Sequence, residues 1–345
     1  MLNEARFFCQ IVLGTTLFIL LCPEVAFSGT SWKTWQDKSG PIPLVNQCPI
    51  QLLFLQPVPD RAETLPKGHG SIRLNTTVTN TLVSKEESAH YEATVDMETI
   101  RTSFEVCYGL LPGLELGFAL PVSHFYSGFM DRPIKDVEET FGKTRSVRAQ
   151  EQANEFSYSV EKDGKVIISG SEDSTGIGDL VLRAKANVLD QVDTLPAIST
   201  RVSVKLPTGR EGRAFGSGEP DWGFGLLFEK DVKRLSLYFN ADVTFPGEAF
   251  DDVGLSLKEF YTLLLGVEYA LSPRFSILSQ MYYLTRPFEH TGVEVLDRRI
   301  CELLIGLNYQ TRGKIFVQAG CVEDIFDSCD ATADVTLFMN LGMNF

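Results

Sequence analysis

The chain has 345 residues, of which 44% are hydrophobic and 22% charged, so its bulk composition is that of an ordinary folded protein. Its formal net charge is −14 at pH 7, which excludes the basic surface that nucleic-acid binding requires. After residue 28 no apolar stretch reaches the roughly 18 residues of a membrane-spanning helix. Composition therefore excludes a helical membrane protein and a nucleic-acid binder.

The first 28 residues have the layout of a secretory signal peptide. Arg6 precedes an apolar run over residues 11–21, and Ala26 and Ser28 are the small residues expected at a cleavage site. We therefore expect export and cleavage near Ser28. A transmembrane anchor remains an alternative, although the run is shorter than the ~20 residues needed. Lipidation at Cys22 is a second alternative, although no small residue precedes that cysteine.

Residues 29–70 differ from the rest of the chain. Six prolines lie between Pro41 and Pro66, with one apolar run at residues 50–55. Proline at this density prevents a regular sheet, because each one removes a backbone donor. We interpret the segment as a periplasmic lead-in or as a plug in the mouth of the domain that follows.

From residue 71 onward, apolar residues alternate with polar ones. Residues 234–245 are a clear case, with apolar side chains at the odd positions from Leu235 to Phe245. This period of two predicts β-strands with one apolar face. Twelve strands are expected, at residues 71–84, 90–109, 112–124, 178–188, 194–207, 221–231, 234–246, 257–271, 273–286, 297–310, 312–322 and 332–345.

The connections between these strands alternate between short and long. Such alternation, with an even strand number, is typical of outer-membrane barrels, which have short periplasmic turns and long extracellular loops. We therefore predict an all-β fold, a transmembrane antiparallel β-barrel of about 12 strands. A hairpin at residues 156–161 and 165–170, turning at Lys162-Asp163-Gly164, gives 14 strands as an alternative.

Two strands carry additional information. In residues 90–109, the apolar side chains move from odd to even positions near Thr99, which predicts a β-bulge there. The last strand alternates to the final residue, which is aromatic, as in the assembly signature that the barrel-assembly machinery reads. The residues of this expected signal are Leu337, Met339, Leu341, Met343 and Phe345.

Several short motifs resemble known families. Outer-membrane channels linked to meta-pathway degradation of phenols are similar at residues 176–180, 204–209 and 216–218. A family of uncharacterised proteobacterial proteins of unknown function is similar at residues 40–55, 96–98 and 128–142. Together the resemblance covers nearly the whole mature chain. It implies an outer-membrane barrel and a channel, and it transfers no catalytic residue.

Charged residues are expected on the lumen-facing side of the strands. A basic wall is predicted from Arg183, Lys185, Arg201 and Lys205 on two neighbouring strands, opposite acidic candidates at Glu105, Glu115, Glu229, Asp242, Glu268 and Glu302. Such groups form selectivity rings in pores. The alternative is that they neutralise one another in a partly filled interior, and the large apolar residues on the same faces keep it open (Leu227, Leu264, Leu278, Leu304 and Phe338).

The longest loop, residues 125–177, is expected to begin with an amphipathic helix over residues 131–142, with Asp131 as its N-cap. It either folds into the lumen or caps the surface. Asp131 with Asp136, Glu138 and Glu139 could hold calcium, but such a run is more often a solvated helix face. No metal site is predicted.

Catalysis is not expected. Only four histidines are present, and His69 with Ser71 forms a pair at strand spacing, without an obvious third member of a triad. No Gly-x-Ser-x-Gly elbow and no His/Cys metal spacing occur. Five cysteines remain after cleavage, and only Cys321 and Cys329 lie close enough in sequence to suggest a bridge. No cofactor is predicted.

We therefore expect an outer-membrane barrel of a Gram-negative bacterium that passively admits small organic or amphipathic solutes. Its other expected partners are outer-membrane lipid and the assembly machinery. The main alternative is a plugged, non-conducting barrel with a structural or surface-interaction role. A lipolytic enzyme is the distant alternative.

Overall fold

The computed structural model describes residues 40–140, 156–192, 194–250, 253–311, 314–324 and 335–345. The expected signal peptide and its cleavage near Ser28 lie outside the described residues, as does Cys329 of the suggested bridge. In the described part of the chain, no helix is long and apolar enough to cross a membrane.

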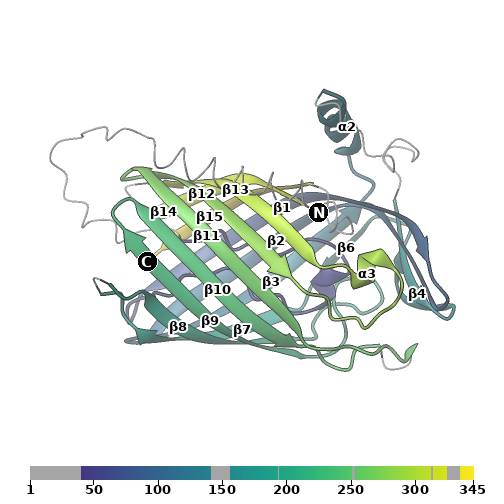
Figure 1. Cartoon of the computed structure of the whole chain (residues 1–345), viewed down its shortest axis with the longest axis horizontal. Helices are drawn as coiled ribbons and strands as arrows, with labels where there is room; N and C mark the ends of the chain where they lie inside the picture. Colours follow the sequence, from purple (N-terminus) through teal and green to yellow (C-terminus); the bar gives the residue numbers. More distant parts are fainter. Residues whose placement is uncertain (1–39, 141–155, 193, 251–252, 312–313, 325–334) are drawn as a thin grey trace.

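Twelve described strands form a closed antiparallel ring, β1-β2-β3-β7-β8-β9-β10-β11-β12-β13-β14-β15, in which β15 pairs with β1 (Figure 1). This confirms the predicted barrel and its twelve strands. The strands are β1 (Gly70–Glu87), β2 (Tyr91–Leu111), β3 (Leu114–Tyr126), β7 (Leu180–Leu189), β8 (Ala197–Leu206), β9 (Asp221–Val232), β10 (Leu235–Phe245), β11 (Phe260–Ser272), β12 (Phe275–Leu284), β13 (Ile300–Gln310), β14 (Ile315–Asp324) and β15 (Val335–Asn344).

The two ends of the barrel differ in their connections. At one end, the short-turn end, only brief turns follow β2, β7, β9, β11 and β13. The first and last residues of the ring meet there, because Gly70 and Phe345 exchange backbone hydrogen bonds of 3.0 and 2.9 Å. The other end, the long-loop end, carries the longer connections, including helices α2 (Asp131–Thr140) and α3 (Glu294–Asp297).

Three further strands lie beside the ring at the long-loop end. β4 (Ser157–Lys162) and β5 (Lys165–Gly170) form the predicted hairpin, with positive φ angles of 51° at Asp163 and 74° at Gly164. β4 pairs only with the part of β2 that extends beyond β3, and β6 (Ser174–Ile177) pairs with the end of β3. The alternative of 14 barrel strands was wrong, because this hairpin does not enter the ring.

The predicted β-bulge near Thr99 was also wrong. β2 pairs with β1 and β3 without a register shift at that position. Odd-numbered side chains point inward along the whole strand, but their surroundings change. Val95 and Met97 pack in an apolar core at the long-loop end, whereas Ser103 and Glu105 face a polar lumen. The apolar residues change position because the interior changes, and the backbone continues straight.

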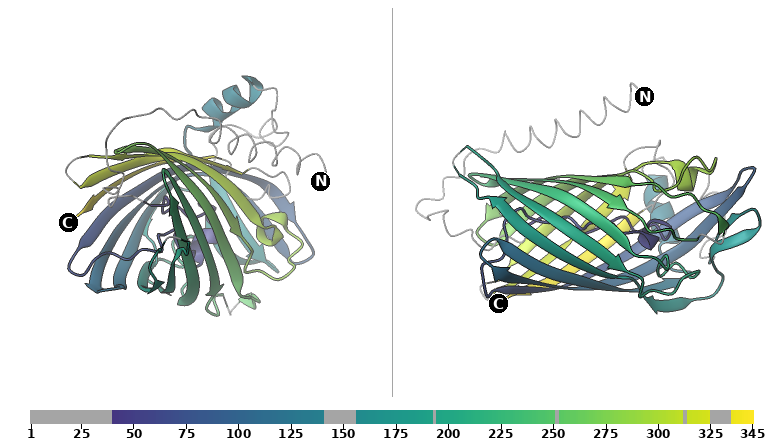
Figure 2. Two further views of the ribbon diagram at one scale, coloured as in Figure 1. Left: turned by 60° about the vertical axis from the view of Figure 1, so that its left-hand side comes forward. Right: turned by 90° about the horizontal axis from the view of Figure 1, so that it is seen from below.

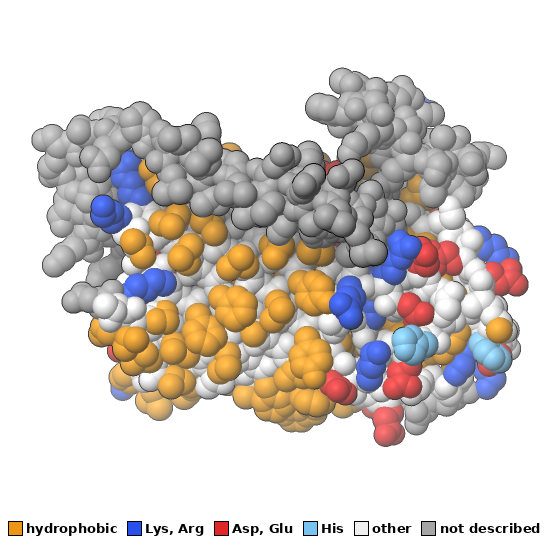
Figure 3. Space-filling model, viewed as in Figure 1, with side chains coloured by type: hydrophobic (Ala, Val, Ile, Leu, Met, Phe, Trp, Pro, Cys, Tyr) orange, Lys and Arg blue, Asp and Glu red, His pale blue; other side chains and the backbone are white. Residues whose placement is uncertain are grey.

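The outer wall of the ring is apolar. Side chains such as Phe224, Leu265 and Leu307 are exposed on its outer face. Hydrophobic side chains cover the middle of the visible face, while most charged groups gather toward its ends (Figure 3). An apolar band between two polar rims is the surface that a barrel presents to lipid. The alternating sequence therefore places its apolar face outward, and the polar face of each strand is left to line the interior.

Candidate functional site

Residues 40–69 are called here the lumenal segment; residues 40–62 lie inside the ring of strands, and the rest leads out at the short-turn end to β1 (Figure 2). One arm rises from Gly40, and Asn46 Nδ2 donates to Glu302 near the long-loop end of β13, at 2.7 Å. The short 3-10 helix η2 (Gln51–Leu53) reverses the chain. The second arm then returns to the short-turn end, where β1 begins. Both arms meet beside Arg61, since a Cβ atom on Gly40 would lie 2.4 Å from its Cγ.

Side chains of the barrel wall bind the backbone of the returning arm. Asp221 accepts a hydrogen bond from the Leu55 amide at 2.7 Å, and Glu115 accepts one from the Leu65 amide at 2.8 Å. The amide of Asn240 contacts both the N–H and the C=O of Asp60, at 2.9 and 3.0 Å. A proline-rich arm cannot pair as a strand, so its buried backbone groups need such partners. The wall provides them.

The predicted basic wall is inward-facing and buried, and each cation has an acidic partner. Arg201 binds Asp242 through two hydrogen bonds of 2.7 Å. Lys205 lies 3.0 Å from Asp221 and 3.4 Å from Asp179, and Arg183 lies 3.3 Å from Glu105. Lys185 lies 3.0 Å from Asp60 and 3.3 Å from Glu115. Each of these cations thus lies beside at least one carboxylate, and a role in ion selection stays a prediction.

The acidic candidates also point inward, and none is more than 5% exposed. Glu229 binds Arg61 of the lumenal segment at 2.8 Å. Glu268 pairs with no cation in the contacts described and instead accepts hydrogen bonds from Tyr238 at 2.7 Å, from Asn308 at 2.9 Å and from Ser276.

Four of the ion-pair partners were missed by sequence reasoning: Asp60, Arg61, Asp179 and Asp221. The only signal for the first two is an acid and a base next to each other in a proline-rich stretch. Burial acts to raise the pKa of Asp60, but the neighbouring cations of Lys185, Arg183 and Arg201 hold that pKa below its ordinary value. Asp60 is therefore ionised inside the barrel.

Apolar side chains fill much of the remaining interior. Ile42 packs with Leu278, Leu304 and Phe338, three of the residues predicted on the lumenal face. Leu227 packs with Ala62 of the returning arm. Leu264 belongs to a larger cluster at the long-loop end, into which the tip of the lumenal segment projects.

That larger cluster is called here the outer core. Its centre is Phe54, 3% exposed, whose ring lies edge-on to Phe260 at 6.4 Å and to Phe288 at 5.6 Å. Phe125, Phe215 and Tyr158 extend the cluster toward β4. The long-loop end of the barrel is therefore filled by apolar side chains from the wall, the loops and the lumenal segment.

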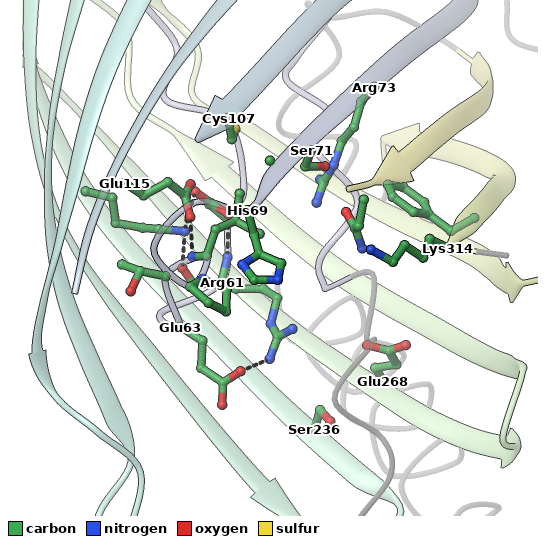
Figure 4. A pocket seen from close by; sticks show the side chains of 18 of the residues that line it. Arg61, Glu63, His69, Ser71, Arg73, Cys107, Glu115, Ser236, Glu268 and Lys314 are labelled. Carbon is green, nitrogen blue, oxygen red and sulfur yellow. Dashed lines mark hydrogen bonds and ion pairs between the residues drawn. The ribbon is translucent and has the colours of Figure 1, made fainter. Parts of the chain in front are cut away.

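The short-turn end is hollow. A cavity of about 730 Å³, called here the vestibule, opens there between the returning arm and the wall (Figure 4). Its lining includes Arg61, Glu63, His69, Ser71, Arg73, Cys107, Glu115, Arg183 and Lys314. A second space of about 70 Å³ lies farther in, between the lumenal segment and the wall near Arg101 and Ser123. The interior thus narrows from a charged mouth to a filled outer core.

Among the described residues, His69 and Ser71 do not form the hydrogen-bonded pair that the distant enzymatic alternative requires. His69 is exposed, and its ring lies 3.4 Å from the carbonyl of Lys67, whereas the buried Ser71 hydroxyl has no hydrogen-bond partner among the described residues. At the candidate cation sites, described carboxylates already contact other side chains of the protein. Asp131 accepts a hydrogen bond from Asn80 at 2.9 Å, and the side chains of Glu138 and Glu139 lie outside the described residues. Glu63, Glu229 and Asp231 converge within 4.8 Å, but Arg61 already supplies a cation to the first two.

The final strand presents its apolar residues to the outside. Leu337, Met339, Leu341 and Met343 are exposed on the outer wall, and the ring of Phe345 lies against Gly70. This arrangement places the expected assembly signal on the lipid-facing side, next to the seam between β15 and β1. Recognition by the assembly machinery stays a prediction.

Comparison with known proteins gives a family and a fold. Residues 17–345 match the family described as "Protein of unknown function (DUF3187)". The crystal structure of the COG4313 outer membrane channel from Pseudomonas putida F1 is similar, with a TM-score of 0.56 and 13% identity over 83% of this chain and 99% of that one. The NanC porin follows, with a TM-score of 0.45 and 8% identity over 79% of this chain and 98% of that one. No curated protein matches the chain.

Proposed function

We propose that this chain, which belongs to the DUF3187 family of proteins of unknown function, is an outer-membrane channel for small organic or amphipathic solutes that its own lumenal segment closes at rest. Its apolar outer wall supports a place in the lipid bilayer, with the short-turn end toward the periplasm. The barrel fold that it shares with an outer membrane channel is consistent with this role but does not identify a solute.

The observation that carries the proposal is the polar wall behind the lumenal segment. Ser199, Arg201 and Thr244 are buried beside the segment, and each donates a hydrogen bond to one of its carbonyl groups. Water can satisfy these same groups when the segment leaves. Such a polar wall is expected in a hydrated pore. In a permanently filled interior, burying polar side chains costs more free energy than burying apolar ones.

The path of the lumenal segment supports its movement. Both of its arms start at the short-turn end, near Arg61 and Gly70, and the part around the turn η2 reaches the long-loop end. The segment can therefore withdraw toward the periplasm as a loop, without threading past a wall strand. Withdrawal breaks the contacts of Phe54 in the outer core and the ion pairs of Asp60 and Arg61.

The solute class follows from the two ends of the path. A solute entering from outside meets the aromatic outer core first and then the paired charges of the lumen. A small molecule with an apolar body and a polar group suits both surroundings. The sequence resemblance to channels linked to phenol degradation supports the same class.

The test is conductance of the folded protein in a planar bilayer. Intact mature protein is compared with a variant that lacks residues 40–66 and with one that carries Asp60→Asn and Arg61→Gln together. We expect brief, rare openings from the intact protein, more frequent ones from the double substitution and a steady open level from the deletion. Silence from all three folded proteins overturns the channel proposal.

The second candidate is a plugged barrel with a structural or surface-interaction role. The apolar packing of Ile42 against Leu278, Leu304 and Phe338 favours it, because such a cluster resists hydration. Silence in the conductance experiment is the result that this candidate expects.

A further inference from the structure

We propose that a row of side chains on the vestibule wall forms a binding site for the carboxylate group of a small organic anion. The row consists of Ser71, Cys107 and Arg183, on β1, β2 and β7. The inference rests on the proposed function for the way a solute reaches the vestibule, and it deepens that function by naming a solute class.

Strand register brings the row together. Ser71 lies opposite Cys107, Cys107 opposite Gly117, and Gly117 opposite Arg183. The side chain of Arg183 crosses over Gly117, and its Nη2 donates to Cys107 Sγ at 2.7 Å. The glycine is required, because a Cβ atom there would lie 2.9 Å from Arg183 Nε. The Nη2 end of the guanidinium group thus lies beside Cys107, on the strand next to that of Ser71, while Nε lies over Gly117 on β3.

Two buried polar atoms in this row have no hydrogen-bond partner among the described residues. They are Ser71 Oγ and Arg183 Nε. Ser71 is 4% exposed and the Arg183 side chain is 9% exposed, and both residues line the vestibule. Leaving such groups unpartnered is unfavourable, so a ligand that supplies the missing acceptor gains free energy there.

The chemistry of the donors selects the ligand. An arginine N–H can only donate, and a serine hydroxyl donates readily to an anion, so the bound atoms must be acceptors. A charged acceptor forms the stronger hydrogen bond with guanidinium. A carboxylate provides two oxygens, one for each donor.

An apolar body also has a place in the vestibule. Phe316 lines the same cavity, with the guanidinium carbon of Arg73 5.1 Å above its ring, and Phe345 also belongs to the lining. Of the lining residues, seven are Lys or Arg and five are Asp or Glu. A small aromatic or aliphatic carboxylate therefore meets donors at one end and aromatic surface at the other.

The test is equilibrium binding to the folded mature protein in detergent, measured by calorimetry without reference to conductance. The probes are benzoate and its neutral analogue benzamide. We expect benzoate to bind at least about tenfold more tightly than benzamide. Ser71→Ala should weaken benzoate binding about fivefold or more, and Arg183→Lys about tenfold or more, because each removes one donor.

Matched controls separate binding from folding. Ser71→Ala removes an oxygen without a partner, so the melting temperature should stay as in the parent protein, and Arg183→Lys keeps the charge beside Glu105. Lys233→Ala changes a cation on the distant β9–β10 turn of the same vestibule and should leave benzoate binding unchanged. Equal binding of the two probes, no benzoate binding, or benzoate binding that neither row variant alters overturns the site. Binding without conductance overturns only the channel, and conductance without benzoate binding overturns only the site.

Discussion

The two halves of the barrel interior hold the same segment by different interactions. At the long-loop end, Phe54 is surrounded by aromatic and aliphatic side chains of the outer core. At the short-turn end, Asp60 and Arg61 are held by ion pairs and hydrogen bonds beside an open vestibule. Apolar burial is non-directional, whereas ion pairs fix orientation. We therefore expect the outer half to contribute most of the free energy that holds the lumenal segment in the barrel, and the inner half to fix the position of the segment.

The largest expected effect is at the outer core. Phe54→Ala leaves a cavity at the tip of the lumenal segment and should lower its free energy of opening by about 3–5 kcal/mol. Amide hydrogen exchange in residues 48–56 should then accelerate about a hundredfold or more. Phe104→Ala, on the outer wall, is the matched control and should change nothing inside. Unaltered exchange in the Phe54 variant would show that the outer core does not hold the segment.

An intermediate effect is expected from the charge on Asp60. Asp60→Asn keeps the backbone contacts with Asn240 but loses the ionic bond to Lys185, at a cost of about 1.5–3 kcal/mol. Exchange in residues 57–65 should accelerate at pH 7. The exposed Asp163→Asn is the control.

The same variant tests a pH dependence. Because the folded state holds the pKa of Asp60 below its ordinary value of 3.8, its contribution is complete above that value and is lost as the pH falls through the lower, folded pKa. Protection of the segment, corrected for intrinsic exchange, should be constant from pH 7 to pH 5 and begin to fall only below about pH 4. In Asp60→Asn this acid-induced loss should be smaller, and an equal loss in both proteins would contradict the assignment.

The smallest expected effect concerns one neutral hydrogen bond. Ser199→Ala removes the bond to the carbonyl of Ala62 and should cost about 1 kcal/mol, or roughly a fivefold increase in exchange near residue 62. Ser279→Ala, on the outer face of β12, is the control. If Ser199→Ala has an effect as large as Phe54→Ala, the proposed division between the two halves is wrong.

Much of the fold could be predicted because each strand records its surroundings in its own residues. The predicted strands at 221–231 and 234–246 correspond to Asp221–Val232 and Leu235–Phe245. The prediction failed at Thr99, where the same alternation was interpreted as a bulge. A change from polar to apolar surroundings along one straight face gives the same pattern as a backbone irregularity, and residues of a single strand cannot separate the two.

Less of the candidate site could be predicted. The inward direction of Arg183 and Arg201 followed from their place on alternating strands, but their partners did not. Asp60 lies 125 residues from Lys185 in the chain, in a segment without periodicity. A contact of that kind depends on where an irregular segment lies in space. The row of Ser71, Cys107 and Arg183 likewise needs the register of four strands.

The sequence by itself determined that this chain closes into a twelve-stranded barrel with an apolar outer wall, because alternation, strand length and the order of short and long connections are local properties. Only the tertiary structure decided what occupies the interior. Residues 40–62 enter the lumen because the wall offers polar partners to their backbone and the outer core buries Phe54. These stabilising contacts join groups far apart in the chain, so they exist only once the barrel has formed.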